Sequence, residues 1–291
     1  MQFRSYIELM KLRIGFLIAV SAMAGYAAVA PQVNAWQLVV LFLAMLLGSS
    51  GSAVFNQFYD RDIDGLMPRT EKRPLVTGTV QDANRALWFA GTLLISGCVI
   101  ALLSFNWVVS LHLFLGAFVY GFVYTVWLKR RHWSNIIIGG GAGSFAVLAG
   151  AAAVDPNIWL LPTLMAITLF LWTPSHFWAL AILIKDDYAK AGVPMLPVIS
   201  GDAVCAKWIF ANTVALVISA FLPLAFGQLG WIYAIISTGF GARFLWLNWK
   251  LVLDPTKSVA RRNFLFSMQY LGGVFSAVVI DKHLPLSTLG L

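Results

Sequence analysis

Apolar runs long enough to cross a lipid bilayer recur along the whole chain. A helix needs about 20 residues, at about 1.5 Å each, to span about 30 Å of hydrocarbon. Nine runs approach that length, and they lie at residues 12–30, 36–59, 84–104, 107–128, 133–153, 158–184, 207–226, 229–249 and 264–281. With 60% apolar and 11% charged residues, the chain lacks the polar side chains that cover a soluble domain. We therefore expect an all-α, polytopic membrane protein with nine transmembrane helices in a single domain over residues 1–291.

The basic residues select one orientation for these helices. Nine spans place the N-terminus and the second, fourth, sixth and eighth connections on one side, and that side carries all of the 20 lysines and arginines except Lys282. Because basic loops stay in the cytoplasm, the pattern predicts a cytoplasmic N-terminus in the bacterial inner membrane. The net charge of +8 indicates anionic lipid headgroups or an anionic substrate as partners. No basic run is interleaved with soluble structure, so nucleic acid is not expected.

The acidic residues gather on the same side, although they contribute little to membrane orientation. All of the 12 aspartates and glutamates except Asp155 and Asp281 lie there. Short loops on the opposite side would also leave the charges on this one. The acids are bunched in two places rather than spread, however, and this favours a site for a metal ion and an anion.

The first acidic group lies at the cytoplasmic end of the second span, in the segment NQFYDRDID. On a helix, Asn56, Asp60 and Asp64 are spaced by four residues and project from one stripe. Three oxygen-bearing side chains in register suit Mg²⁺, which prefers oxygen ligands and is often shared with substrate phosphates. The alternative is a solvated helix end whose aspartates only pair with Arg61 or Arg69. An amide one turn deeper favours the metal site, because it needs a partner inside the protein.

Several basic residues follow this group in a short loop. Arginine binds phosphate oxygens with two parallel N–H groups, so Arg69 and Arg73 are candidates to bind a diphosphate. The positive-inside rule also predicts bases here without any catalytic role. For a single residue, the sequence does not separate these two explanations.

The second acidic group, with Lys185, Asp186 and Asp187, lies at the cytoplasmic end of the sixth span. Because both groups are on one side, a helical bundle can bring them together around one diphosphate and two Mg²⁺ ions. Two adjacent aspartates alone are more typical of a solvated loop. Only their pairing with the first group makes them candidate ligands.

The segment from Asn56 to Asp64 resembles the NxxxDxxxD motif of the UbiA superfamily of intramembrane prenyltransferases, and nine spans agree with that fold. Within it, the chain is most similar to the protoheme IX farnesyltransferase (haem O synthase) family. That similarity is carried by NQFYDRDIDGLMPRTEKRPL, YTVWLKR of residues 124–130 and TPSHFWALAILIKDDYAKAGVPMLP of residues 173–197. The second acidic segment departs from the DxxxD of other superfamily members, because Lys190 stands four residues after Asp186. Its DDYAKAG form looks like the haem-farnesylating family.

The resemblance implies an activity, a cofactor and a set of site residues. The family transfers the farnesyl group of farnesyl diphosphate to a vinyl group of haem B, forming haem O and diphosphate, with Mg²⁺ as cofactor. The implied metal ligands are Asn56, Asp60, Asp64, Asp186 and Asp187. The implied diphosphate-binding residues are Arg69, Arg73, Lys185, Asp186 and Asp187. Catalysis would depend on Asn56, Asp60, Asp64, Tyr124 and Lys129.

Three candidate site residues need further comment. Lys129 would stabilise the departing diphosphate. Tyr124 shares a helix face with Tyr120 and would line the path of an allylic cation, although packing of buried aromatic rings explains the pair equally well. His176 is an ionisable residue inside the sixth span, close to Pro174, and would contact haem as an iron ligand or a polar group. A neutral histidine bonded to a neighbouring helix is the alternative.

Two other functions stay open at this point. One is a UbiA-type prenyltransferase that acts on a quinone precursor or chlorophyllide, and the other is a transporter of an anionic metabolite. Transporters usually have matching interrupted helices in two halves and a site at the midplane, whereas the acidic groups here lie at one face. The partners implied are farnesyl diphosphate, haem B and membrane lipid. A downstream haem-modifying enzyme or terminal oxidase assembly is left open.

Overall fold

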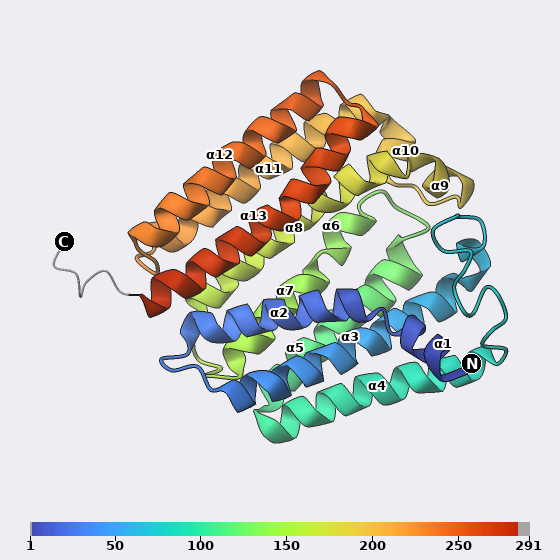
Figure 1. Cartoon of the computed structure of the whole chain (residues 1–291), viewed down its shortest axis with the longest axis horizontal. Helices are drawn as coiled ribbons and strands as arrows, with labels where there is room; N and C mark the ends of the chain where they lie inside the picture. The colour runs from blue at the N-terminus through green and yellow to red at the C-terminus, as the bar shows by residue number, and fades with distance from the viewer. Residues whose placement is uncertain (1, 285–291) are drawn as a thin grey trace.

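The computed structural model describes residues 2–284, which form helices joined by loops, with no strand in that range. The helices are α1 (Gln2–Leu9), α2 (Leu12–Val29), α3 (Ala35–Asp64), α4 (Ala83–Ser104), α5 (Trp107–Phe118), the π-helix η1 (Val119–Leu128), α6 (Asn135–Gly139), α7 (Gly141–Ala152), α8 (Leu160–Leu183), α9 (Lys185–Lys190), α10 (Leu196–Ser200), α11 (Asp202–Ala225), α12 (Trp231–Leu253) and α13 (Lys257–His283). The long helices run side by side, and α1, α9, α10 and the loop after α3 lie together at one end (Figure 1).

The nine expected spans correspond to long helical segments of the described chain, and the all-α, multi-pass prediction is confirmed. Eight of these segments are long and apolar enough to cross a membrane. The fourth and fifth are each built from two helices, α5 with η1 and α6 with α7. The span expected at residues 229–249 is α12, a helix of 23 residues that is less apolar because it contains three tryptophans, Arg243 and Asn248. It packs along α11 and α13 like the other members of the bundle.

Polar caps fix where three of the spans begin. The side-chain oxygens of Asn34, Asp82 and Asn106 each accept hydrogen bonds from two backbone N–H groups in the first turns of α3, α4 and α5. Asn106 also donates to the backbone oxygen of Ala152 at 2.8 Å. A single residue in the α4–α5 link therefore starts α5 and ties it to the end of α7.

The first half of the bundle is held by close backbone approach. A Cβ atom on Gly25 of α2 would lie 2.2 Å from the backbone oxygen of Val147, and one on Gly150 of α7 would lie 1.8 Å from that of Ala22. No side chain fits at these distances, so glycine lets α2 and α7 touch directly. Such contacts stabilise helices in lipid, where packing replaces the hydrophobic effect between them.

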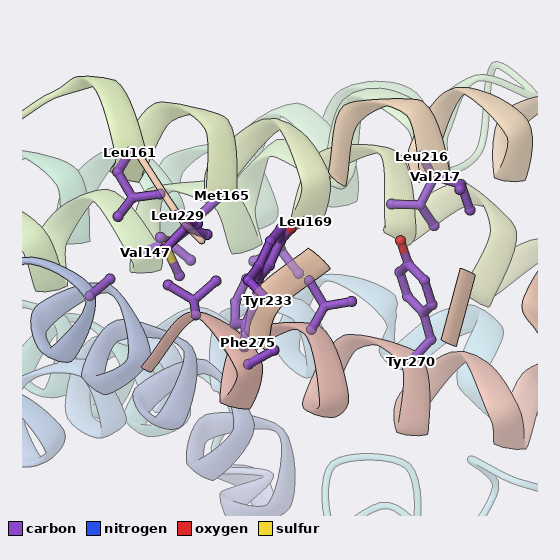
Figure 2. Packing of buried hydrophobic residues seen from close by; sticks show 14 of the residues in the cluster. Val147, Leu161, Met165, Leu169, Leu216, Val217, Leu229, Tyr233, Tyr270 and Phe275 are labelled. Atoms are coloured by element: carbon purple, nitrogen blue, oxygen red, sulfur yellow. The ribbon is translucent and has the colours of Figure 1, made fainter. Parts of the chain in front are cut away.

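The second half is filled by larger side chains. Leu169 of α8, Tyr233 of α12 and Tyr270 and Phe275 of α13 belong to one buried cluster (Figure 2). Tyr233 is satisfied there because its hydroxyl donates to the backbone oxygen of Ala220 at 2.6 Å. This apolar core fixes α8 and α13 relative to each other.

A smaller cluster joins the loops that follow the two acidic groups. Met67, from the loop after α3, packs with Tyr188 of α9, Val193 and Met195, and with Ile136 of α6. All five side chains are buried. The fold therefore brings these two distant loops together at the charged end of the molecule.

Candidate active site

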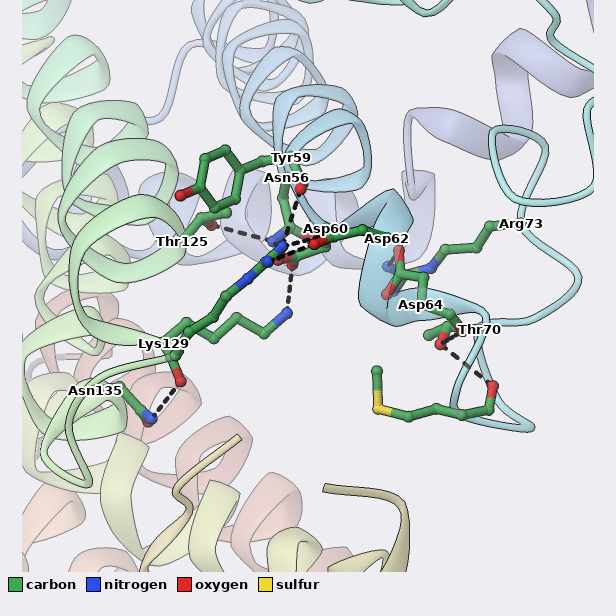
Figure 3. A network of polar contacts seen from close by, with 12 residues as sticks. Asn56, Tyr59, Asp60, Asp62, Asp64, Thr70, Arg73, Thr125, Lys129 and Asn135 are labelled. Carbon is green, nitrogen blue, oxygen red and sulfur yellow. Dashed lines mark hydrogen bonds and ion pairs between the residues drawn. The ribbon is translucent and has the colours of Figure 1, made fainter. Parts of the chain in front are cut away.

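The first acidic group forms a buried stripe on the last turns of α3. Asn56 is 3% exposed and Asp60 and Asp64 are 0% exposed. All three project from one face of the helix, as the spacing predicts, into a network of polar contacts (Figure 3). Their burial is incompatible with a solvated helix end, and we call these three residues the acidic stripe.

Three basic side chains from different segments contact the acidic stripe, and two of them pair with its carboxylates. Lys129, just after η1, forms an ion pair and hydrogen bond with Asp60, and Arg73, from the loop after α3, does the same with Asp64. The Nζ of Lys11, between α1 and α2, donates to Oδ1 of Asn56 at 2.9 Å. Buried carboxylates require such partners, because an uncompensated charge in the interior is strongly destabilising.

The π-helix η1 packs against the acidic stripe and supplies two of its contacts, from Thr125 and from Lys129 at its C-terminal end. The amide of Asn56 donates to Oδ2 of Asp60 at 2.7 Å and to Oγ1 of Thr125 at 3.1 Å. The N–H of Lys129 bonds the carbonyl of Tyr124, five residues earlier. Because this i to i+5 bond widens the helix, the side chains of Thr125 and Lys129 both face α3. Such π-helical turns are frequent at functional sites. The rings of Tyr120 and Tyr124 stack on the same helix with centroids 5.7 Å apart.

An outer ion pair closes the side of this network that faces solvent. Arg130 donates to both oxygens of Asp62 at 2.7 Å and to Oδ1 of Asp60 at 3.3 Å. The side chain of Asp62 is 60% exposed. Asp62 therefore differs from its neighbours in α3, because it points away from the acidic stripe.

The acidic stripe has one oxygen that suits a cation. Oδ1 of Asp64 is buried and has no hydrogen-bond partner among the described residues. The loop above it is fixed by Thr70, whose hydroxyl donates to the backbone oxygen of Asp64 at 2.7 Å. No group of three or more His, Cys, Asp or Glu side chains converges in residues 2–284. The unpartnered oxygen of Asp64, with Asp60 one turn away, fits a cation such as Mg²⁺, which needs only one or two carboxylates and keeps waters and phosphate oxygens as its other ligands.

The second acidic group is placed differently. Asp186 is exposed and accepts a hydrogen bond from Nζ of Lys257 at 3.0 Å, and this bond lowers the pKa of Asp186. Lys185 pairs with Asp202 at 3.0 Å, and Asp187 is half-buried. Among the described residues, no hydrogen bond or ion pair joins Asp186 or Asp187 to the acidic stripe. A metal-binding role for this group stays a prediction.

Tyr188 is the residue of this segment that turns toward the first group. It is 4% exposed, and the guanidinium of Arg69 lies 4.9 Å from the centre of its ring. Arg69 is thus held by an aromatic face rather than by a carboxylate. The two predicted arginines, Arg69 and Arg73, both lie on the loop that covers the stripe.

His176 lies between α8 and α13, inside the bundle. Its Nδ1 is 2.6 Å from Oγ of Ser267, and its ring stacks against Trp172 and Phe264 with centroids 4.3 and 4.6 Å away. This is the arrangement of a histidine bonded to a neighbouring helix. Contact with haem at His176 stays a prediction.

Lys11, Thr125 and Arg130 are site residues that the sequence did not single out. Lys11 is the only residue other than glycine with a positive φ, 47°, in the described part of the chain. Strained backbone of this kind is concentrated at functional sites. Burial lowers the pKa of Lys11 well below its usual value, and the charges of Arg73 and Lys129 lower it further. From the sequence alone, Lys11 is indistinguishable from the other bases that follow the positive-inside rule.

Comparison with known proteins gives one consistent family. Residues 18–271 match the family described as the UbiA prenyltransferase family. The chain is 56% identical to protoheme IX farnesyltransferase 1 of Paramagnetospirillum magneticum, with 97% of this chain and 100% of that protein covered. It is 37% identical to the protoheme IX farnesyltransferase of Hahella chejuensis, with 98% and 95% covered.

Two solved structures have the same fold. One, from work on digeranylgeranylglyceryl phosphate synthase, has 21% identity and a TM-score of 0.78, covering 97% of this chain and 98% of that one. The other is a UbiA homolog from Archaeoglobus fulgidus bound to DMAPP and Mg²⁺, with 18% identity, a TM-score of 0.72 and coverage of 95% and 99%. At these identities, the likeness concerns the arrangement of the helices.

Proposed function

The chain belongs to the UbiA prenyltransferase family, and we propose that it transfers the farnesyl group of farnesyl diphosphate to a vinyl group of haem B, forming haem O and diphosphate. The observation that carries this proposal is the buried acidic stripe surrounded by Lys11, Arg73 and Lys129. Carboxylates and cations meeting at one end of a membrane bundle suit a metal-bound diphosphate. The named relatives, similar over nearly the whole chain, support haem B as the acceptor.

Asp60 and Asp64 are the residues that would hold Mg²⁺. The unpartnered Oδ1 of Asp64 supports this role, as does the A. fulgidus homolog, whose structure contains DMAPP and Mg²⁺. When bound, the ion neutralises charge on the diphosphate and makes it a better leaving group. Asp187, which is half-buried, would supply any further metal ligand from α9, whereas Asp186 is paired with Lys257.

The bases around the acidic stripe would bind the diphosphate oxygens. Lys11, Arg73 and Lys129 already reach the stripe from three directions, so each can donate to an anion placed there. Donors fixed in advance stabilise the charge that develops on a leaving group without costly reorganisation. Arg69 and Lys185 would extend this set at its outer edge.

The aromatic residues of η1 would face the reacting carbon. When the C1–O bond of farnesyl diphosphate breaks, an allylic cation forms, and the stacked rings of Tyr120 and Tyr124 stabilise positive charge. The vinyl group attacks C1, and water adds to the resulting haem cation with loss of a proton, which gives the hydroxyethyl group. Apolar surroundings limit competing attack by water on the allylic cation. His176 is the residue we assign to the haem side.

The sidedness of the charges supports one face of the membrane as the location of this reaction. The stripe is on the last turns of α3, and α3 ends on the side of the bundle that carries α1, α9 and α10 (Figure 1). By the positive-inside rule, we assign that end to the cytoplasmic face of a bacterial inner membrane. We propose that the haem O product passes to a downstream haem-modifying enzyme or to terminal oxidase assembly.

The test is haem O formation by purified protein in lipid nanodiscs. Wild-type protein given haem B, farnesyl diphosphate and Mg²⁺ should yield a haem with the added mass of a farnesyl group and a hydroxyl group. Asp60→Asn should lose this activity, because it removes the charge but keeps the shape, whereas Asp62→Asn, on the exposed side of the same helix, should stay within about threefold. Wild-type turnover by the Asp60→Asn protein would show that the acidic stripe does not have the proposed role. A quinone precursor accepted in place of haem B would reassign the acceptor.

A further inference from the structure

Arg243 is a charged residue in the middle of a membrane-spanning helix. On α12 it lies ten residues before Leu253, at the cytoplasmic end, and twelve residues after Trp231, at the opposite end. At about 1.5 Å per residue, these separations are about 15 and 18 Å. Because the hydrocarbon of a bilayer is about 30 Å thick, the backbone of Arg243 lies close to its middle.

The side chain of Arg243 stays at this depth. It is exposed, and its guanidinium lies 4.9 Å from the centre of the Phe266 ring on α13. Phe266 is nine residues from Lys257, at the start of α13, and therefore about 14 Å from the end of the helix. The guanidinium thus packs on a ring inside the hydrocarbon and does not extend to the lipid headgroups.

No carboxylate of the described chain neutralises Arg243. Within residues 2–284 it forms no ion pair and no hydrogen bond. Its helix, α12, packs against α11 and α13 at the outer edge of the bundle (Figure 1). An arginine within a membrane costs free energy and almost always pairs or faces the interior of a bundle. An exposed, unpaired one therefore indicates an anionic partner from outside the chain.

A second polar side chain and two glycines lie on the same pair of helices. Gln269, three residues after Phe266 on α13, is exposed, and its amide forms no hydrogen bond in the described part of the chain. Gly239 of α12 and Gly272 of α13 are exposed, and a Cβ atom on either would meet no neighbouring atom within 4 Å. Unlike the glycines between α2 and α7, these two are not required by packing inside the bundle. Small residues on an outer face let a further helix approach closely.

The chain itself cannot supply the missing anion. Of its 12 acidic residues, ten lie on the cytoplasmic side and Asp155 and Asp281 on the opposite side, so none is in the middle of a span. Two copies inserted with the same orientation meet at equal depths, and a second copy would therefore bring no carboxylate to Arg243. Phospholipid phosphates lie in the headgroup layer, about 15 Å away along the helix.

We propose that the outer face of α12 and α13 around Arg243 binds a transmembrane helix of another membrane protein, one that carries an aspartate or glutamate at the same depth. The carboxylate would pair with the guanidinium through two parallel hydrogen bonds, and Gln269 would hydrogen-bond across the interface. Gly239 and Gly272 would let the helices come into contact. None of the residues that contact the acidic stripe belongs to α12 or α13, so this surface is distinct from the reaction site.

Model transmembrane helices test the charge requirement. Full-length protein is reconstituted in phosphatidylcholine vesicles with 23-residue peptides of leucine and alanine that carry Glu, Gln or Leu at the centre, and energy transfer between labels measures association. The Glu peptide should bind wild-type protein at least about tenfold more tightly than the Gln peptide, and Arg243→Leu should abolish this preference. Arg262→Leu, an exposed arginine near the start of α13, is the matched control and should keep it. Equal binding of the Glu and Gln peptides by wild-type protein would overturn the proposal.

The glycines give a second test, and the other possible occupants give contrary outcomes. Gly239→Leu should weaken binding of the Glu peptide about tenfold, whereas Gly91→Leu, on α4 where a Cβ atom also meets nothing within 4 Å, should have little effect. Gel filtration verifies that each variant is folded. If Gly239→Leu instead abolished association between two labelled copies of the chain, the face would be a homodimer interface. If Arg243→Leu weakened haem B binding and left the order of the peptides unchanged, Arg243 would bind a haem carboxylate. Either result would overturn the proposal.

Discussion

The two acidic segments lie at the same end of the molecule and contain the same residue type, yet their environments are opposite. Asp60 and Asp64 are 0% exposed, whereas the side chain of Asp186 is 73% exposed. The buried pair is surrounded by bases from three other segments. Within residues 2–284, Asp186 has a single ion-pair partner, Lys257, that is itself exposed. A carboxylate becomes part of a reactive site when the rest of the chain surrounds it.

The helices that carry these segments explain the difference. α3 continues without a break for 30 residues, so its last turns remain inside the bundle and beneath the loop that contains Thr70 and Arg73. α8 ends at Leu183, and Ile184 leaves the helical conformation with φ −116° and ψ 31°. The chain then turns into α9, which presents Asp186 to Lys257 and buries Tyr188 instead.

The largest effect that this contrast predicts is at Asp64. Asp64→Ala removes a buried carboxylate and leaves Arg73 without its ion-pair partner, so haem O formation should fall at least about 100-fold. The isosteric Asp64→Asn should lose activity as well while keeping the fold. Turnover in nanodiscs, with gel filtration to verify the folded state, measures both. Near wild-type turnover of well-folded Asp64→Asn would show that the buried carboxylate is not needed for the reaction.

The second largest effect should be a difference in Mg²⁺ requirement between variants of the two acidic segments. Chelation should abolish haem O formation, and added Mg²⁺ should restore it. The Mg²⁺ concentration for half-maximal activity should rise at least about tenfold in Asp60→Glu, where the ligand geometry changes, and stay at the wild-type value in Asp186→Ala. Equal shifts in both variants would show that α9 contributes to the same metal site.

Lys11 offers a test of the basic residues around the acidic stripe. Lys11→Met removes one donor with little change in volume, and kcat/KM for farnesyl diphosphate should fall about 10- to 100-fold, the range expected for a hydrogen bond to a charged group. Arg13→Met, two residues away and exposed, is the matched control and should have little effect. If both variants lose activity equally, the effect belongs to the charge of the N-terminal segment as a whole.

The smallest effect is expected at Asp186. Asp186→Ala removes one exposed ion pair with Lys257, and such pairs contribute about 0–1 kcal/mol. Steady-state turnover should therefore stay within about threefold of wild type, as should that of Lys257→Ala. A loss comparable to that of Asp64→Ala would support the metal role that the family resemblance implies for this residue.

Two of the site predictions show how far local sequence patterns extend. The four-residue spacing of Asn56, Asp60 and Asp64 is a property of one helix, and the structure places all three on a single face as expected. His176 has an equally clear pattern, an ionisable group inside a span. Its hydrogen bond to Ser267, 91 residues later, depends on where α13 packs, which no local pattern reveals.

The sequence by itself determined the membrane class, the long helices, the side on which the charges lie and the register of the acidic stripe. These follow from hydropathy and from the helical period, which act over one or a few turns. Only the tertiary structure decided that Lys11 reaches Asn56 and Lys129 reaches Asp60, contacts between residues 45 and 69 positions apart. Burial and charge pairing depend on which helices pack together, and for this reason two similar acidic segments acquired opposite environments.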